Sequence, residues 1–413
     1  MGFPRMTTRL GLGGLLAALA VELADELVDG TKSAAMPLIR HDLQLSYVQV
    51  GLLAAVPLLV GSLLELPVGV ISGGPSRRRR FVLAGGLVFV ASVLAAGLAT
   101  SFAGLLIALT IFFPASGMFV SLTQAGLMDA DPPRRAQHMA RWTLAGSVGA
   151  VTGPILVAAV LGAGGTWRLA FVLIAGPSFA SWCGVVWTGR DPKTGNGAAP
   201  PSADHDRAAD DSGAEDQAGW PGWRSAWSIV RQSGVLRWLA LLEVADLLLD
   251  VLTPFLALYL VAVVHVAPPV AALAIAVRLG AGLAGDVILV SVLARQDSRR
   301  VIRASIWATL VLFPAFLLVP GFGLKLAVLA GLTLATAPWY PILQAELYGS
   351  LAGRSGLAVS LTSASGLAAA LGPLAVGLLA EHFGLSWAMA ALCVVPVLML
   401  AVPVARRRAP GAS

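Results

Sequence analysis

Charged residues are scarce in this sequence. Asp, Glu, Lys and Arg make up 12% of its 413 residues, whereas soluble globular proteins carry about 25%. Hydrophobic residues make up 57%, and the mean hydropathy is +0.82. A chain with so little charge cannot cover a water-exposed surface, which excludes an ordinary soluble globular protein. We therefore expect an all-α protein that crosses a membrane many times.

Cysteine is equally scarce, and its two copies, Cys183 and Cys393, lie far apart in apolar runs. This excludes a disulfide framework and predicts two packed thiols without a redox role. The five His residues lie in loops or near helix ends, and neither Cys neighbours an acidic cluster. We therefore expect no metal and no cofactor. The sequence contains no phosphate-binding loop, so an ion gradient is the expected energy source.

The sequence does contain many apolar runs of about 20 residues or more, the length at which an α-helix crosses a bilayer. Twelve runs are predicted to span, near 10–37, 46–73, 78–99, 102–128, 135–162, 167–188, 233–263, 267–294, 301–320, 323–348, 355–381 and 385–405. They fall into two bundles of six, over residues 1–188 and 233–413. Between them, 189–232 is predicted to be a polar cytoplasmic linker. Trp220, Trp223 and Trp227 in the linker fit an interfacial helix or an early start of the seventh span.

Basic residues gather in alternate loops. The side that holds Arg5 and Arg9 also holds Arg77 to Arg80, Arg134, Arg135, Arg295, Arg299, Arg300, Arg303, Arg354 and Arg406 to Arg408. The opposite side holds only Lys32, Arg40, Arg168 and Lys325. The positive-inside rule then places both chain ends in the cytoplasm, and we expect the protein to lie in the plasma membrane. These loops also account for the pI of 9.9, so we expect no nucleic-acid partner.

An acidic motif lies inside the first apolar run of each bundle. Its members in the first bundle are Glu22, Asp25 and Asp29, and it recurs in the second as Glu243, Asp246 and Asp250, with every member displaced by the same interval. At about 100° per residue, positions i, i+3 and i+7 share one helix face, so each copy should aim three carboxyl groups the same way. A charge at that depth costs roughly 2.5–3.5 kcal/mol, so we expect these groups to face a cavity or each other.

Further matched pairs extend the repeat. The two members of each pair are separated by nearly the same number of residues. The pairs are Gly61 with Gly282, Glu65 with Asp286, Gln124 with Gln344, Pro154 with Pro373, and Trp167 with Trp387. Their order predicts two parallel six-helix repeats, a transporter architecture whose substrate site lies near the middle of the membrane. Glu26 has no counterpart, because Leu247 takes its place, and it is the expected source of asymmetry.

On these features the sequence resembles the major facilitator superfamily, over nearly the whole chain. The family's loop between helices two and three usually reads Gly-x-x-x-Asp-Arg-x-Gly-Arg-Arg. Residues 69–78 keep the first Gly and the basic run, but Gly73 replaces the Asp. Residues 149–154 are similar to the motif of drug/proton antiporters, and 45–52 resemble fosmidomycin-resistance-like exporters. The resemblance implies alternating access, with helices one, four, seven and ten lining the cavity.

The acidic residues are the candidate proton- or cation-coupling groups: Glu22, Asp25, Glu26, Asp29, Glu243, Asp246 and Asp250. The alternative is structural pairing with the embedded arginines Arg141 and Arg278. Seven carboxyl groups outnumber two bases, so some must be protonated or hydrated. We expect Arg278 to pair with Glu243.

The remaining candidates concern the cavity and a gate. Gln124, Trp339, Tyr340 and Gln344 are predicted to line the substrate cavity, with helix-to-helix bonding or packing as the alternative. Pro338 and Pro341 predict a break in the tenth span. Glu65, Asp286, Arg77 and Arg354 are predicted to form a cytoplasmic gate. Snorkelling of the two acids to the membrane surface remains open.

The resulting expectation is a monomeric secondary transporter in the lipid bilayer. It would couple protons to the export of a small organic compound, cationic or amphipathic. Proton-coupled uptake of a polar metabolite or a hard cation is the alternative. An intramembrane enzyme is more remote, because its acid and base need different environments, whereas these carboxyl groups are duplicated symmetrically. No catalytic residue is assigned.

Overall fold

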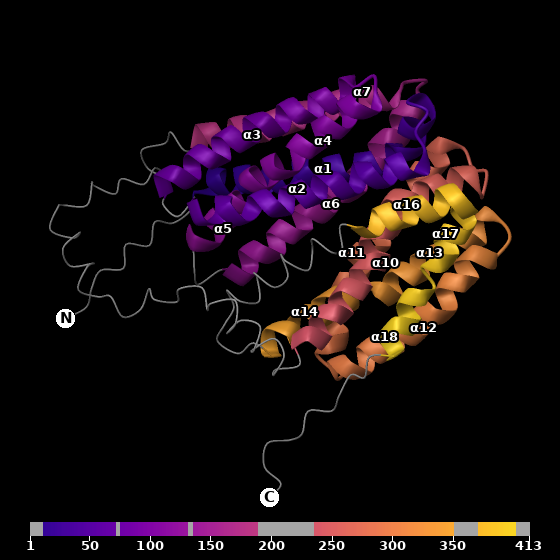
Figure 1. Cartoon of the computed structure of the whole chain (residues 1–413). Helices are drawn as coiled ribbons and strands as arrows, with labels where there is room; N and C mark the ends of the chain where they lie inside the picture. The colour runs from indigo at the N-terminus through magenta and orange to yellow at the C-terminus, as the bar shows by residue number, and fades with distance from the viewer. Residues whose placement is uncertain (1–10, 72–74, 131–134, 189–234, 351–370, 402–413) are drawn as a thin grey trace, which may run out of the picture.

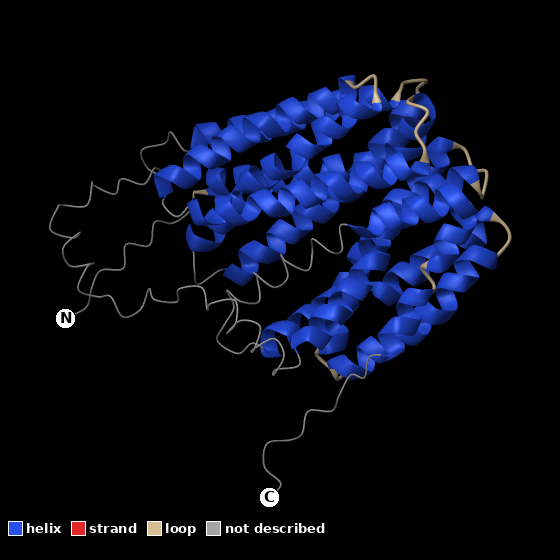
Figure 2. Cartoon of the chain, in the orientation of Figure 1, coloured by secondary structure: helices blue, strands red, loops and turns tan. Residues whose placement is uncertain are grey.

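The computed structural model describes residues 11–71, 75–130, 135–188, 235–350 and 371–401. In these ranges the chain is helical apart from short turns (Figure 2), which confirms the all-α prediction. Nine helical runs within the described ranges are long and apolar enough to cross a membrane. The proposed linker with its three tryptophans lies outside the described residues.

The N-terminal half contains six successive helical segments, as predicted. They are α1 (Leu12–Asp42), α2 (Tyr47–Ile71), α3 (Pro75–Leu98), α4 (Phe102–Ser116) with its continuation through the π-helix η1 (Gly117–Ser121) and α5 (Leu122–Ala130), α6 (Arg135–Gly162) and α7 (Trp167–Thr188).

The C-terminal half follows the same order. Its described helices are α10 (Val235–Ala262), α11 (Pro268–Leu293), α12 (Ser298–Leu318), α13 (Phe322–Thr336), α14 (Trp339–Ser350), α16 (Leu371–Phe383), α17 (Leu385–Ala391) and α18 (Val394–Ala401). The predicted break in the tenth span is confirmed between α13 and α14, at Pro338, which has no backbone N–H to continue the helix. The described helices of the two halves thus follow the same order along the chain.

Helix α1 is longer than predicted. It continues through Pro37 to Asp42, because Met36 and Ile39 are 3% and 1% exposed and their packing outweighs one lost backbone hydrogen bond. Lys32 lies inside this helix, as the predicted span of 10–37 implies. Lys325 is buried in the first turn of α13, where its ammonium donates to the carbonyl of Leu317 at 3.1 Å.

The two halves lie side by side (Figure 1). We call the end that carries the turns at 43–46, 163–166 and 263–267 the first-loop end, and the opposite end, where α1 begins, the terminal end. Gly164 and Gly384 occupy matching turns at the first-loop end and have φ of 79° and 86°. Because these two glycines are also separated by the interval of the repeat, their shared conformation supports the repeat in three dimensions.

Two interfaces join the halves near the first-loop end. The first seam is formed by α2 and α16, and the second seam by α6 and α11. By the spacing of the repeat, α2 corresponds to α11 and α6 to α16. Helix α1 also contacts α10 and α11.

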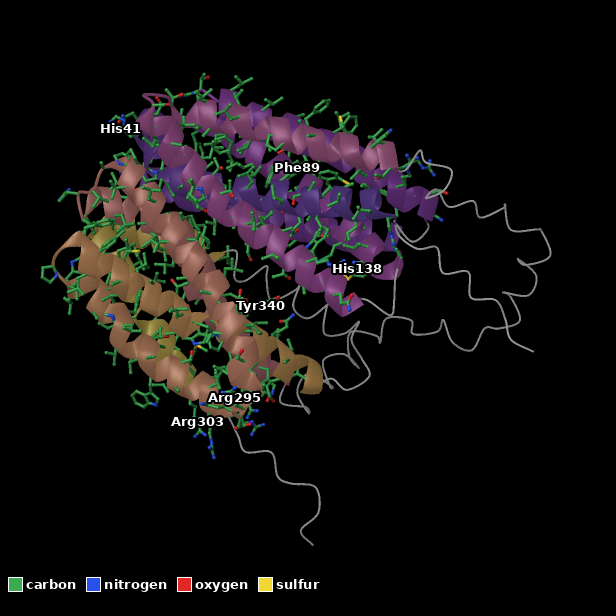
Figure 3. The ribbon with its side chains drawn as sticks, turned by 180° about the vertical axis from the view of Figure 1, so that it is seen from behind. His41, Phe89, His138, Arg295, Arg303 and Tyr340 are labelled. Atoms are coloured by element: carbon green, nitrogen blue, oxygen red, sulfur yellow. The ribbon has the colours of Figure 1, made fainter. Side chains whose placement is uncertain are left out.

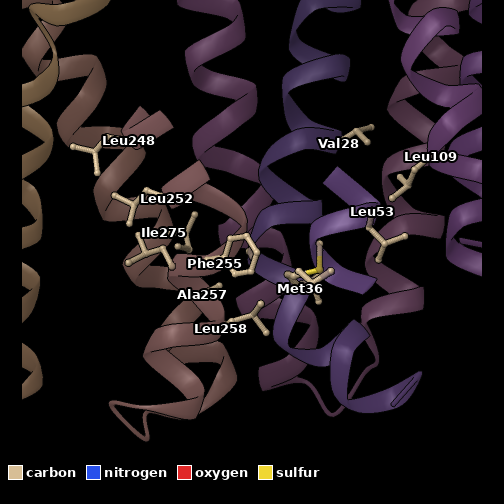
Figure 4. Close-up of a cluster of buried hydrophobic side chains, with 14 of the residues drawn as sticks. Val28, Met36, Leu53, Leu109, Leu248, Leu252, Phe255, Ala257, Leu258 and Ile275 are labelled. Carbon is tan, nitrogen blue, oxygen red and sulfur yellow. The ribbon is translucent and has the colours of Figure 1, made fainter. Parts of the chain in front are cut away.

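Apolar packing fills the interior of each half. Figure 4 shows part of this core, with Val28 and Leu109 from the N-terminal half and Leu248 and Phe255 from the C-terminal half. Helices α1 and α6 approach each other especially closely. A Cβ atom on Gly153 would lie 2.5 Å from the backbone nitrogen of Thr31, so a glycine at this position permits the close contact of the two helices.

Candidate functional site

A cavity of about 410 Å³ lies between the two halves. Its volume falls in the range of roughly 300–1,000 Å³ that is typical of small-molecule sites. The lining positions lie from the middle of their helices toward the terminal end. Among the lining residues, those with charged, amide or aromatic side chains are Glu22, Glu26, Gln124, Trp142, Arg278, Asp286 and Tyr340.

Two carboxyl groups one helical turn apart on α1 form the acidic wall of the cavity. Glu22 lies directly over Gly146 of α6, where an added Cβ atom would be 2.6 Å from its Oε1. Trp142 of α6 makes a side-chain hydrogen bond with Glu22. Glu26 lines the same cavity. The residue without a counterpart in the repeat is therefore part of the site.

The other two acids of α1 have partners elsewhere. Asp25 accepts a hydrogen bond from Ser116 Oγ at 2.8 Å, where α4 changes into the π-helix η1, a distortion that frequently marks functional sites. Asp29 pairs with Lys32 at 2.5 Å, and the Lys32 ammonium lies 5.4 Å from the centroid of the Phe113 ring. Asp25 and Asp29 therefore bind Ser116 and Lys32, and neither lines the cavity.

The second copy of the acidic motif lies on α10. Glu243 and Asp246 are half-buried on α10, and neither lines the cavity. Asp250 lies on α10, but its side chain is outside the description. Their proposed coupling role stays a prediction.

The two embedded arginines differ in position. Arg278 of α11 is 9% exposed and lines the cavity. It donates to Thr253 Oγ1 at 2.9 Å and to the Leu249 carbonyl at 3.3 Å, both on α10. Its pairing with Glu243 stays a prediction. Arg141 is exposed on α6 and does not line the cavity.

The structure separates the four predicted cavity residues. Gln124 and Tyr340 line the cavity, and Figure 3 shows Tyr340 at the boundary between the halves. Trp339 is fully buried and donates to Ser305 Oγ at 2.6 Å, within the C-terminal half. Gln344 is half-buried and does not line the cavity either. Neighbouring positions on a helix point in different directions, which explains why Tyr340 and Trp339 differ.

The predicted gate is only partly described. Asp286 lines the cavity and is exposed, and Arg77 is exposed in the first turns of α3. The side chain of Glu65 is outside the description, and Arg354 lies outside the described residues. Their joint gating role stays a prediction.

Sequence reasoning missed Trp142. A Trp in an apolar run usually belongs to the core, so its residue type gave no signal. Its spacing of four residues from Gly146 places both on one face of α6. A glycine marks a face that can approach another helix, and this was the signal in the sequence that could have indicated Trp142.

Comparison with known proteins agrees with this geometry. A family model described as Major Facilitator Superfamily matches residues 26–344. A bacterial homolog of the human lysosomal transporter Spinster, in an inward-facing and unoccupied conformation, superposes with a TM-score of 0.74 at 16% identity, over 94% of this chain and 95% of that chain. No curated protein sequence matches this chain.

Two other solved transporters show the same fold. The nucleoside transporter NupG has a TM-score of 0.71 at 11% identity, over 95% of this chain and 100% of that chain. The peptide transporter POT, in complex with sulfate, has a TM-score of 0.70 at 16% identity, over 94% of each chain. Identities this low show the fold alone. The family match over most of the chain and the two-fold helical architecture together establish that this protein belongs to the major facilitator superfamily, whose fold serves secondary transport by alternating access.

Proposed function

We propose that this protein exports small organic cations from the cytoplasm in exchange for protons. The observation that carries the proposal is the pair of α1 carboxyl groups, Glu22 and Glu26, on one wall of the cavity between the halves. The aromatic rings of Trp142 and Tyr340 line the same cavity, and such rings attract organic cations.

The charge balance of the cavity favours a cationic cargo. Among the described lining residues, Glu22, Glu26 and Asp286 carry carboxyl groups, and Arg278 carries a guanidinium. Because that guanidinium also donates to two groups on α10, it is held against the C-terminal half, whereas Glu22 and Glu26 belong to the N-terminal half. Charges in such a site are costly unless compensated. A proton or a cationic cargo supplies the compensation.

Competition for the same carboxyl groups provides the exchange mechanism. When a proton occupies Glu22 or Glu26, the charge that holds a cationic cargo is lost, so the two ligands bind alternately. Asp25 lies one turn away on α1, bound to Ser116, and offers a protonation site outside the cavity. We therefore assign cargo binding to Glu22 and Glu26, and proton binding to these residues and Asp25.

The orientation of the protein in the membrane rests on the distribution of basic residues. Arg77 to Arg80 and the arginines between 295 and 303 lie at the terminal end, and Figure 3 shows Arg295 and Arg303 together there. By the positive-inside rule this end is cytoplasmic and the chain ends lie in the cytoplasm. The cavity then extends toward the cytoplasm, from which an exporter in the plasma membrane takes its cargo.

The test uses the purified full-length protein in liposomes that contain a pH-sensitive dye. We expect tetraphenylphosphonium or ethidium to drive proton movement, and collapse of the pH gradient to abolish accumulation of the cation. Glu22→Gln and Glu26→Gln should each lower this exchange about tenfold or more, since each removes a binding charge. Asp297→Asn, which changes an exposed carboxyl group at the start of α12, is the matched control. Accumulation that persists without a pH gradient would exclude proton coupling.

A growth screen against toxic cations separates cargo binding from coupling. Asp25→Asn should retain tetraphenylphosphonium binding by the purified protein but abolish resistance in cells. Asp246→Asn tests whether the C-terminal half shares the coupling role. If Asp25→Asn supports full resistance at normal membrane abundance, Asp25 is not a coupling residue.

A further inference from the structure

Helix α2 begins with a reciprocal pair of hydrogen bonds. The backbone N–H of Ser46 donates to Gln49 Oε1 at 2.9 Å, and the N–H of Gln49 donates to Ser46 Oγ at 3.2 Å. This is a capping box, with Ser46 at the N-cap position and Gln49 three residues later. The first four N–H groups of a helix have no partner inside it. The capping box satisfies two of the four, and the N–H groups of Tyr47 and Val48 remain.

The partner of Tyr47 comes from the other half of the protein. Its N–H donates to Glu381 Oε2 at 2.8 Å, across 334 residues of sequence. Glu381 lies in the last turn of α16. A carboxylate at a helix N-terminus is stabilised by the partial positive charge of that terminus, and hydrogen bonds to an ionised group are roughly twice as strong as neutral ones.

The backbones meet closely around this bond. A Cβ atom on Gly51 would lie 2.7 Å from the Pro373 carbonyl oxygen, and one on Gly377 would lie 2.5 Å from the Tyr47 carbonyl oxygen. The Arg40 guanidinium of α1 lies 4.0 Å from the centroid of the Tyr47 ring. The hydrogen bond therefore closes a seam with no room for any side chain between the two helices at these positions.

The seam and the cavity lie at different depths. The Glu381 bond is at the first-loop end, whereas the cavity extends toward the terminal end. Alternating access requires the first-loop end to open when the terminal end closes, and α2 must then leave α16. We propose that Glu381 is a gating residue, whose bond to the N–H of Tyr47 holds the first-loop end closed and breaks when that end opens. This proposal rests on alternating access and not on the identity of the cargo or the coupling ion.

The bond can be removed from either side. Glu381→Ala removes the acceptor. Tyr47→Pro removes only the donor N–H and the ring, at the first helical position, where proline is well tolerated. Tyr47→Ala is the matched control, because it removes the ring and keeps the N–H.

The measurement is a distance distribution between spin labels on His41→Cys and Trp387→Cys, in a full-length chain that carries Cys183→Ser and Cys393→Ser. Both labelled positions are exposed near the first-loop end. In lipid nanodiscs without cargo, the population at the long distance should rise relative to the population at the short distance. For Glu381→Ala and for Tyr47→Pro we expect this population ratio to rise about tenfold, equivalent to 1.4 kcal/mol. Tyr47→Ala should resemble the parent protein.

The double substitution makes the test strict. If the two groups act through one bond, Glu381→Ala in the Tyr47→Pro background should add nothing further. Distances that do not change in Glu381→Ala, or equal shifts in Tyr47→Ala and Tyr47→Pro, would overturn the proposal. A normal melting temperature for each variant confirms that folding is intact. Because the labels report distance and not transport, failure of the proposed cation exchange would leave this outcome unaffected.

Discussion

The two seams that join the halves are built from corresponding helices but closed by different means. In the first seam, the N–H of Tyr47 at the start of α2 binds Glu381. By the interval of the repeat, the corresponding first residue of α11 in the second seam is Pro268, and proline has no N–H to donate. Near the end of α6, the positions that correspond to Glu381 are Leu161 or Gly162, and neither carries a carboxyl group.

The close helix contact differs in the same way. Gly51 and Gly377 bring the backbones of the first seam together, whereas Ala272 and either Val157 or Ala158 stand at the corresponding positions of the second seam. The repeat therefore preserves the helices and their order, but the second seam lacks the donor and the acceptor that form the polar bond of the first. Corresponding helices of a two-fold repeat can therefore be joined by contacts of different strength. On our proposal, opening at the first-loop end is controlled at α2 and α16.

The largest effect is expected when the first seam is filled. Gly377→Val places a branched side chain against the carbonyl oxygen of Tyr47, where even a Cβ atom would be too close. Overpacking of this kind costs about 1–3 kcal/mol, and we expect transport to fall below about a tenth of the parent rate, since a tenfold change corresponds to 1.4 kcal/mol.

Spin-label distances and melting temperature measure the loss in Gly377→Val. Gly176→Val is the control, because a Cβ atom on Gly176 of α7 meets no atom within 4 Å. Equal behaviour of the two variants would show that close contact at α2 is unimportant.

The second largest effect is expected where the two halves differ at matching positions of α1 and α10. Glu26→Leu gives α1 the residue that α10 has at the matching position, Leu247. We expect the affinity for tetraphenylphosphonium to fall about tenfold, or 1.4 kcal/mol, because one cavity carboxyl group is lost. Adding Leu247→Glu to the Glu26→Leu variant should not restore binding, since Leu247 does not line the cavity. Titration calorimetry on purified protein measures both. Restored affinity in the double variant would mean that the two positions are equivalent after all.

A smaller effect is expected for a bond inside one half. Asp42, the last residue of α1, pairs with Arg168 and accepts a bond from the Trp167 indole at 3.2 Å. The Arg168 hydrogen bond lowers the pKa of Asp42. A lowered pKa stabilises the fold above the ordinary Asp pKa of about 3.9, and this stabilisation disappears as pH falls through the lowered value.

Asp42→Asn should thus reduce stability at pH 7 by roughly 0.2–1 kcal/mol, as exposed pairs do, and the difference should vanish in strong acid. Melting curves at both pH values measure it. Label distances across the first seam should stay as in the parent protein. A change in them would show that a bond within one half also affects opening between the halves.

The smallest effect is expected in the second seam. Pro268→Ala supplies an N–H at the start of α11, but the end of α6 offers no carboxylate to accept it. The ratio of the long-distance to the short-distance population should therefore change less than about twofold, or about 0.4 kcal/mol. Tyr47→Pro, in contrast, should change it about tenfold. A large shift would indicate that the second seam also controls opening.

Much of the fold could be predicted from the sequence. The apolar runs located the helices to within a few residues, and the break at Pro338 followed from its missing N–H. The end of α1 could not be predicted, because Pro37 is a helix-ending signal that burial of Met36 and Ile39 overrides. The ion pair of Lys32 with Asp29 was not predicted either.

The candidate site was predictable only in part. Glu22, Glu26 and Arg278 were named from the sequence, and the structure brings them to one cavity. Asp25 and Trp339 were assigned to the same site, but Ser116 and Ser305 bind them elsewhere. Helical periodicity predicts a face, whereas the partner that a side chain finds depends on helices distant in sequence.

By itself, the sequence determined the number of apolar segments, the parallel repeat and the presence of acids within a membrane span. These properties are local or periodic, since bilayer thickness sets helix length and the repeat spacing can be counted. Only the tertiary structure decided which carboxyl groups share a cavity and which seam carries the polar bond. Glu381 and Tyr47 are 334 residues apart, and no local pattern relates an acceptor in one bundle to a helix terminus in the other.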